Sequence, residues 1–297
     1  MRLFVIGNGF DMGHGLKTKY PDFRNYLSRC YPEFLASFEE NYMIVKQDLW
    51  WNELEANLAN INDDVMVEQA DSVEFGLEGG DIGIEDTLYS EFGHRYEYIE
   101  NFSKYMKQWI RSVRIRDLKK VTSLIVPSAG DKYVTFNYTG VLERVYSIPS
   151  SDILHIHGSL RIKDGDPVIG HGDSEKINEL SEKLKLFEES FDEKKVAGCR
   201  VARDYLMTTF KDTNRMSWKL VNFVPEGTEH ILVIGHSIAG VDQTYFSEID
   251  RLTGKAANWQ VYYYGESKKD ELSENILKCG IDENRVKLVV SDEFYDL

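Results

Sequence analysis

The stretch Leu3-Phe4-Val5-Ile6-Gly7-Asn8-Gly9-Phe10-Asp11 decides the fold. Its four apolar residues predict a short buried strand, and the Gly-x-Gly turn leads into a segment with helical spacing. Glycine lets the backbone approach a ligand closely, and the helix that follows presents N–H groups that favour an anion. A turn without a ligand is an equally open interpretation, because Met12 stands where a G-x-G-x-x-G fingerprint has its third glycine.

The composition is that of a globular protein. The chain has 297 residues, of which 42% are hydrophobic and 29% charged, enough for one large α/β domain or two smaller ones. No apolar run is long enough to span a membrane or to form the core of a signal peptide. The cysteines at 30, 199 and 279 are too far apart for a disulfide framework or a structural zinc site. We therefore expect a cytoplasmic protein with no membrane contact and no metal.

The net charge of −15 is concentrated in one interval. Between Lys46 and Arg95 the chain has no Lys or Arg and carries thirteen carboxylates. Such a surface repels a phosphate backbone, so we expect no direct contact with nucleic acid. The simpler interpretation is a solvated face. The alternative is a docking surface for a basic partner or for a trigger, with the trigger site at about residues 62–85.

Short apolar runs alternate with helical spacing along the chain. The predicted strands are residues 2–7, 132–136, 153–156, 230–234, 260–264 and 285–290. This alternation predicts an α/β fold, with a Rossmann-like, mostly parallel sheet and helices on both faces. We expect a single domain over residues 1–297, with a helical, acidic insertion at about 33–120 and a second helical segment at about 174–222.

Small or polar residues follow several predicted strands at the same end. The first strand ends in Gly7-Asn8-Gly9, Asn137 follows the second strand, His157 follows the third, and Gly235-His236-Ser237 follows a later one. A lone Asn after a strand is usually a turn former, and a lone His is more often structural. Ligands of open parallel sheets, however, bind beyond the carboxyl ends of the strands. We therefore expect these four strand ends to converge in one cleft.

Several motifs resemble known families. Thr135-Phe136-Asn137-Tyr138-Thr139, followed by His157-Gly158-Ser159, resembles the sirtuin pair of T-x-N-x-D and H-G-S. Gly7-x-Gly9 with Pro21-Asp22-Phe23-Arg24 is similar to the sirtuin G-A-G…P-D-F-R loop. The bacteriophage abortive infection AbiH family is resembled more fully, through I-G-N-G-F-D at 6–11, F-N-Y-T at 136–139, H-I-H-G at 155–158, G-H-G at 170–172 and G-H-S at 235–237 with Asp242, Tyr245 and Phe246.

The resemblance implies a function in antiphage defence. It implies a sirtuin-like (DHS-like) fold whose pocket binds NAD, as ligand or as substrate, and cleaves it to nicotinamide and ADP-ribose. Protein deacetylation is disfavoured, because the four-cysteine zinc module is missing and Thr139 replaces the acidic residue of T-x-N-x-D. The residues implied to contact NAD are Gly7, Asn8, Gly9, Phe10, Asp22, Phe23, Gly235, His236 and Ser237.

Three residues are the candidates for chemistry. Asn137 could orient a ribose hydroxyl or the attacking water, and Asp11 could stabilise a cation-like ribose. His157 could act as general base, because histidine titrates near neutral pH. In a strand, His155 would share a face with His157, so either histidine is open as the base.

Two other functions stay open. The protein could bind NAD or ADP-ribose without chemistry and act through a partner effector. It could also be a metal-dependent hydrolase built on Asp11, His157 and His171. A phage-derived or protein trigger and a homo-oligomer also stay open as partners.

Overall fold

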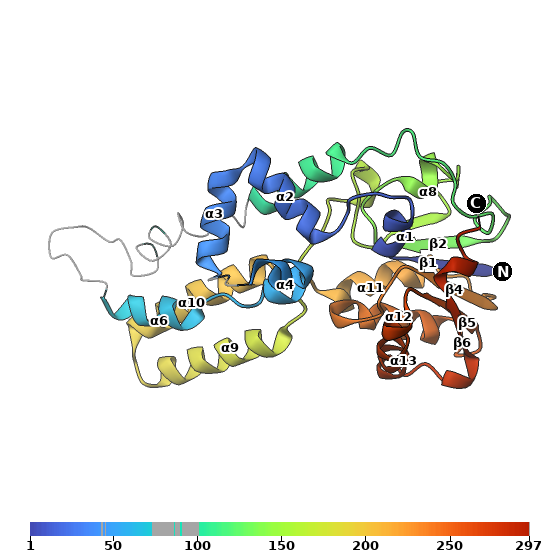
Figure 1. Ribbon diagram of the computed structural model, residues 1–297. Coiled ribbons are helices and arrows are strands. Elements are labelled where there is room, and N and C mark those ends of the chain that lie inside the picture. Colours follow the sequence, from blue (N-terminus) through green and yellow to red (C-terminus); the bar gives the residue numbers. More distant parts are fainter. Residues whose placement is uncertain (43, 45, 73–85, 87–89, 91–100, 297) are drawn as a thin grey trace. The chain divides into compact units, whose positions relative to one another are not determined.

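The computed structural model describes residues 1–42, 44, 46–72, 86, 90 and 101–296. Its contacts divide the chain into two compact units (Figure 1). Unit 1 consists of Met1–Lys19, Met106–Val168 and Asp212–Leu297. Unit 2 consists of Tyr20–Tyr105 and Ile169–Lys211. That residues 1–297 form a single domain stays a prediction.

The described residues of unit 1 form a six-stranded, all-parallel sheet. The strands are β1 (Arg2–Ile6), β2 (Lys132–Thr135), β3 (Ile153–His155), β4 (His230–Ile234), β5 (Asn258–Tyr263) and β6 (Val286–Val290). Their order is β3-β2-β1-β4-β5-β6, so β1 lies inside the sheet and residues 3–6 are fully buried. The predicted α/β fold with a parallel sheet is confirmed, and its sirtuin-like identity stays a prediction.

Helices cover both faces of this sheet (Figure 1). On one face, Phe10 and Val141 pack with Phe4 of β1. On the other face, Phe246 and Ile276 belong to the core cluster around β1, β4 and β5. Unit 1 includes the helices α1 (Asn8–Gly13), α8 (Val141–Arg144), α11 (Thr213–Val221), α12 (Gln243–Leu252) and α13 (Lys269–Lys278). Single-turn 3₁₀ helices are η1 (Ile162–Asp164), η2 (Gly240–Asp242), η3 (Glu266–Lys268), η4 (Glu283–Arg285) and η5 (Ser291–Glu293).

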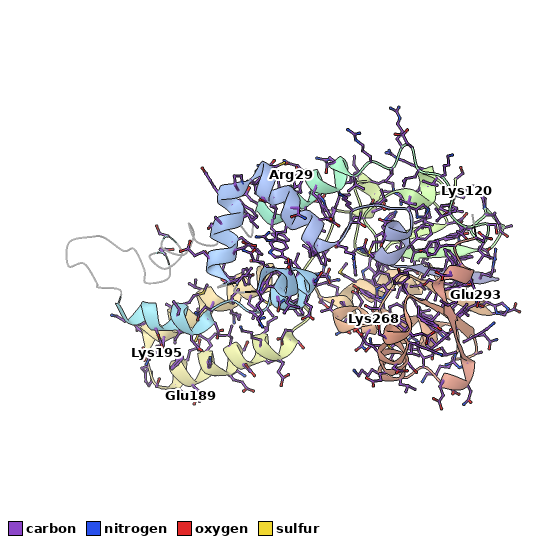
Figure 2. The ribbon with its side chains drawn as sticks, in the orientation of Figure 1. Arg29, Lys120, Glu189, Lys195, Lys268 and Glu293 are labelled. Carbon is purple, nitrogen blue, oxygen red and sulfur yellow. The ribbon has the colours of Figure 1, made fainter. Side chains whose placement is uncertain are left out.

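Unit 2 is helical in most of its described residues. Its helices are α2 (Tyr20–Cys30), α3 (Pro32–Asn41), α4 (Gln47–Asn52), α5 (Leu54–Asn57), α6 (Asp63–Ser72), α9 (Ser174–Glu189) and α10 (Glu193–Thr208). The ring of Phe102 lies 5.4 Å from the rings of both Phe23 and Phe38, centroid to centroid. Helices α9 and α10 pack together, and Glu189 and Lys195 lie near the turn that joins them (Figure 2).

The predicted helical segments divide between the units. Of the segment at 174–222, α9 and α10 belong to unit 2 and α11 to unit 1. Of the insertion at 33–120, residues 101–112 are helical and residues 113–120 are not. Most of the acidic stretch at 62–85, namely residues 73–85, lies outside the described residues. No helix within the described ranges has both the length and the apolarity to cross a bilayer.

Candidate functional site

Three glycines bring the turn after β1 against the turn after β4. A Cβ atom on Gly7 would lie 2.5 Å from the carbonyl oxygen of Gly235, and one on Gly9 would lie 2.6 Å from its Cα. Gly235 also has φ +66°, a conformation that favours glycine. The N–H groups of Gly7 and Gly9 donate to the carbonyls of Ile234 and Gly235, at 2.9 and 2.8 Å. In this conformation, those two amides are used within the protein rather than offered to a phosphate.

The remaining residues predicted for binding are divided between the units. The Asn8 side chain donates to the Thr18 carbonyl at 3.0 Å and accepts from the Thr18 hydroxyl at 2.6 Å. Ser237, after β4, is exposed. Asp22 and Phe23 lie in α2 of unit 2, where Phe23 is fully buried among aromatic rings. The structure therefore brings the residues from β1 and β4 together, but it assigns Asp22 and Phe23 to the other unit.

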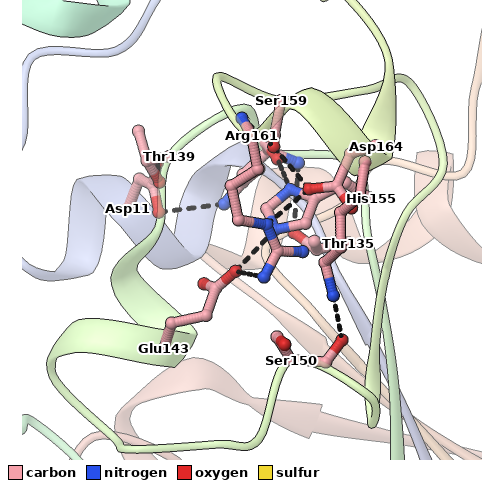
Figure 3. Close-up of polar contacts among 11 residues, drawn as sticks. Asp11, Thr135, Thr139, Glu143, Ser150, His155, Ser159, Arg161 and Asp164 are labelled. Atoms are coloured by element: carbon pink, nitrogen blue, oxygen red, sulfur yellow. Dashed lines mark hydrogen bonds and ion pairs between the residues drawn. The ribbon is translucent and has the colours of Figure 1, made fainter.

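Asp11 is a buried carboxyl group in the first turn of α1. Its side chain accepts hydrogen bonds from the Thr139 hydroxyl at 2.6 Å and from the Asn137 amide at 3.0 Å. Burial raises the pKa of Asp11 to about 6, although both hydrogen bonds and the nearby His155 act in the opposite direction. Figure 3 shows Thr139 next to this carboxyl group. Asp11 can therefore change its charge close to neutral pH.

Asn137 joins the ends of three strands. Its side-chain amide donates to both Asp11 and the Gly7 carbonyl, the second at 3.1 Å. Its backbone N–H donates to the Thr135 hydroxyl at 3.1 Å, and its carbonyl faces His155 Nδ1 at 2.9 Å. Asn137 is 7% exposed, so these bonds fix a nearly buried side chain. Asp11 and Asn137, two of the candidates for chemistry, are therefore in direct contact.

His155 anchors a charged cluster that the sequence interpretation missed. Its Nδ1 carries a proton, because the carbonyl opposite can only accept, and its Nε2 lies 3.0 Å from Glu143 Oε1. Arg161 lies 2.6 Å from the same carboxylate and 2.5 Å from Asp164 (Figure 3). Burial raises the pKa of Glu143, but the hydrogen bond and charge of His155, a backbone hydrogen bond and the charge of Arg161 together bring it below its usual value. The spacing of Glu143, His155 and Arg161 along the chain gives no signal for this cluster.

His157 does not share the surroundings of His155, contrary to expectation. Strand β3 ends at His155, so the alternation of side chains does not continue to His157. His157 Nε2 lies 3.4 Å from Asp242 Oδ1, and His236 Nε2 lies 3.4 Å from Asp242 Oδ2. The Phe136 ring packs against both histidines, with centroid distances of 5.1 and 4.3 Å. His155 therefore donates a hydrogen bond to the Asn137 carbonyl, whereas His157 belongs to a second group around Asp242.

The candidate catalytic residues are almost fully buried in this conformation. Asp11, Asn137 and His157 are 1%, 7% and 3% exposed. A hollow of about 440 Å³ lies instead at the opposite edge of the sheet, beside Arg2, His230 and Asn258. A ligand at the carboxyl ends of the strands therefore requires a local opening.

The residues considered for a metal do not form one group. Within the described residues, no three or more His, Cys, Asp or Glu side chains are placed to hold a metal ion. His171 belongs to unit 2, where its Nδ1 accepts from the Asp173 N–H and its Nε2 faces the Leu206 carbonyl. Backbone contacts thus account for both nitrogens of His171.

Two comparisons with known proteins bear on these sites. The family model described as bacteriophage abortive infection AbiH matches residues 3–263. This range contains β1 from its second residue, all of β2 to β5, and every residue of the two groups around Asp11 and Asp242. A search of curated proteins finds no match.

Proposed function

We propose that this chain, which belongs to the bacteriophage abortive infection AbiH family, serves in phage defence by binding NAD and hydrolysing its nicotinamide–ribose bond. The binding place is the carboxyl edge of the sheet, where the strand order reverses between β1 and β4. We expect the diphosphate near Asn8 and Ser237, which flank this reversal, because the amides of Gly7 and Gly9 already donate within the protein.

The observation that carries the proposal is the environment of Asp11. This carboxyl group is 1% exposed and is oriented by Asn137 and Thr139. Because its pKa is raised to about 6, it is mostly ionised at pH 7 and above. A negative charge held in poorly solvated surroundings interacts strongly with a developing positive charge. That is what a cation-like ribose requires.

The proposed reaction consumes one water molecule. The bond between ribose C1′ and the nicotinamide nitrogen breaks, and its electron pair neutralises the pyridinium. A water oxygen bonds to C1′, and His157 accepts the proton that the water releases. Asp11 stabilises the positive charge on the ribose, and Asn137 orients the water or a hydroxyl. The products are nicotinamide, ADP-ribose and one proton.

A sensor without chemistry is the second candidate. The observation that favours it is the burial of the same three residues, Asp11, Asn137 and His157, in this conformation. A sensor would bind NAD or ADP-ribose and pass the signal to a partner effector. It would return the dinucleotide intact.

The test is to incubate the purified chain with NAD and to follow nicotinamide by chromatography. We expect His157→Ala, Asn137→Ala and Asp11→Asn each to lower the rate by about 10²–10⁴-fold while the protein stays folded. The matched controls are His230→Ala, Asn222→Ala and Asp117→Asn, which change exposed residues of unit 1. Binding of NAD by calorimetry without release of nicotinamide would favour the sensor. Wild-type rates in both His157→Ala and Asn137→Ala would end the proposed mechanism.

A further inference from the structure

His236 is held in one tautomer by its own turn. The Ile238 N–H donates to His236 Nδ1 at 2.9 Å, so that nitrogen carries no proton. In the neutral ring the proton is therefore on Nε2, which lies 3.4 Å from Asp242 Oδ2. The side chain of His236 is 8% exposed, which limits competition from water. His236 thus presents a fixed N–H to one oxygen of Asp242.

The turn that follows His236 contains a residue with an unfavourable backbone conformation. Ile238 is β-branched and fully buried, yet it has φ +52°. This conformation is an outlier for a β-branched residue, and such outliers concentrate at functional sites. The Gln243 side chain donates to the Ile238 carbonyl at 3.3 Å, and Gly240 also has a positive φ, +63°. The turn therefore holds Ile238 in the conformation that directs its N–H at His236.

The second oxygen of Asp242 faces His157. Oδ1 lies 3.4 Å from His157 Nε2, and the side chains of His157 and Asp242 are 3% and 16% exposed. Tyr245 is also adjacent, with its ring centroid 5.4 Å from that of His157. Lys219 donates to the Ile156 carbonyl next to His157 at 3.1 Å. Of these neighbours, Asp242 is the one that carries a negative charge.

We propose that Asp242 is a positioning residue for His157 and that His236 holds Asp242 in that role. This inference rests on the proposed function, in which His157 accepts the proton of water. When His157 is protonated, the carboxylate stabilises the imidazolium, as a carboxylate does beside a general-base histidine. Because Nδ1 of His236 is occupied by the Ile238 N–H, its Nε2–H continues to face Asp242. The sequence Gly235-His236-Ser237 with Asp242 therefore supports the base rather than only lining the ligand.

The test is a pH titration of the full chain labelled with ¹⁵N-histidine, followed by NMR. The signals of the two rings are assigned with His157→Gln and His236→Gln. We expect the titration midpoint of His157 to fall by about one pH unit or more in Asp242→Asn, because a nearby carboxylate favours the charged ring. Asp117→Asn, an exposed match, should leave it unchanged. In the wild type, the ¹⁵N shifts should report the Nε2–H tautomer for neutral His236.

His236→Asn is the second variant, because its short side chain can still accept the Ile238 N–H but cannot reach Asp242. It should lower the His157 midpoint by less than Asp242→Asn does. An unchanged midpoint in either folded variant, or a proton on Nδ1 of neutral His236, would overturn the inference. These readouts do not depend on cleavage of NAD. If NAD stays intact while the titrations behave as expected, the proposed function fails and the pairing stands.

Discussion

Two buried aspartates at opposite edges of the same sheet receive very different partners. Asp250, near the amino ends of β5 and β6, is 2% exposed and accepts from both terminal nitrogens of Arg285, at 2.8 and 2.9 Å. The Trp259 ring adds a third hydrogen bond at 3.1 Å. Asp11, near the carboxyl ends of β1 and β2, is 1% exposed and accepts from Thr139 and Asn137, which are both neutral.

The difference separates an aspartate whose charge is paired with an arginine from one that receives hydrogen bonds from neutral side chains. The hydrogen bond with Asp250 raises the pKa of Arg285, as expected for a compensated ion pair. Asp131 at the same amino edge is similarly bound by Arg2. At Asp11, the hydrogen bonds from Thr139 and Asn137 and the nearby His155 offset the cost of burial only in part, and the pKa is raised to about 6. Uncompensated buried charges are concentrated at functional sites, which favours the carboxyl edge as the site.

The largest effect is expected for Asp250→Asn, which tests whether the ion pair of Asp250 stabilises the fold. The change leaves the Arg285 guanidinium without its counter-charge in a place where its side chain is only 16% exposed. We expect the free energy of unfolding in urea to fall by about 3–5 kcal/mol. NAD cleavage per folded molecule should not change, because Asp250 lies at the other edge of the sheet. Unchanged stability would mean that the ion pair does not hold the fold; Asp117→Asn is the exposed control.

The pH dependence of stability tests the other aspartate of the comparison, Asp11. The ordinary pKa of the group is 3.8, and in the folded protein it is about 6, so the folded state binds the proton more tightly. The resulting stabilisation is complete below pH 3.8 and is lost as the pH rises through 6. We expect the unfolding free energy of Asp11→Asn, relative to wild type, to rise by up to about 3 kcal/mol between pH 4 and 7. Parallel curves for the two proteins, measured in urea at several pH values, would contradict this.

The smallest expected effect is that of Thr139→Val. The variant keeps the shape of the side chain and removes the hydrogen bond that helps to ionise Asp11. We expect the pKa of Asp11 to rise further and the unfolding free energy at pH 7 to fall by about 1 kcal/mol. A carboxyl ¹³C titration measures the first change and urea unfolding the second. Thr208→Val, at an exposed position, is the matched control. A lower pKa of Asp11 in Thr139→Val would contradict the prediction that this hydrogen bond favours the ionised carboxylate.

The sequence predicted the sheet and part of the site for a simple physical reason. Runs such as residues 3–6 and 230–234 are apolar because the strands are covered on both faces, and that pattern is local. Parallel strands bring their carboxyl ends to one edge, so the meeting of Asp11 with Asn137 followed from topology. What the sequence indicates well is therefore whatever depends on strand identity and direction.

Other features depend on tertiary contacts that no local pattern encodes. The prediction that His155 and His157 lie on the same face of a strand was wrong, because β3 ends at His155. The partnership of Glu143 with Arg161 joins a helix to a loop and leaves no periodic signal. Asp22 and Phe23 matched a binding-loop pattern, but they belong to an aromatic helical unit whose contacts are set by the fold.

The pairing of β1 with β4 has a consequence for synthesis of the chain. Arg2 pairs with His230 and Ile6 with Ile234. The strand β1 therefore cannot pair with β4 until more than two hundred further residues have been made. At about 5–20 residues per second, that delay is roughly 10–45 s. The acceptors for Gly7 and Gly9, on Ile234 and Gly235, emerge equally late. A nascent chain therefore lacks the turn beside Asp11, and the surroundings of Asp11 stay incomplete until most of the protein has been made.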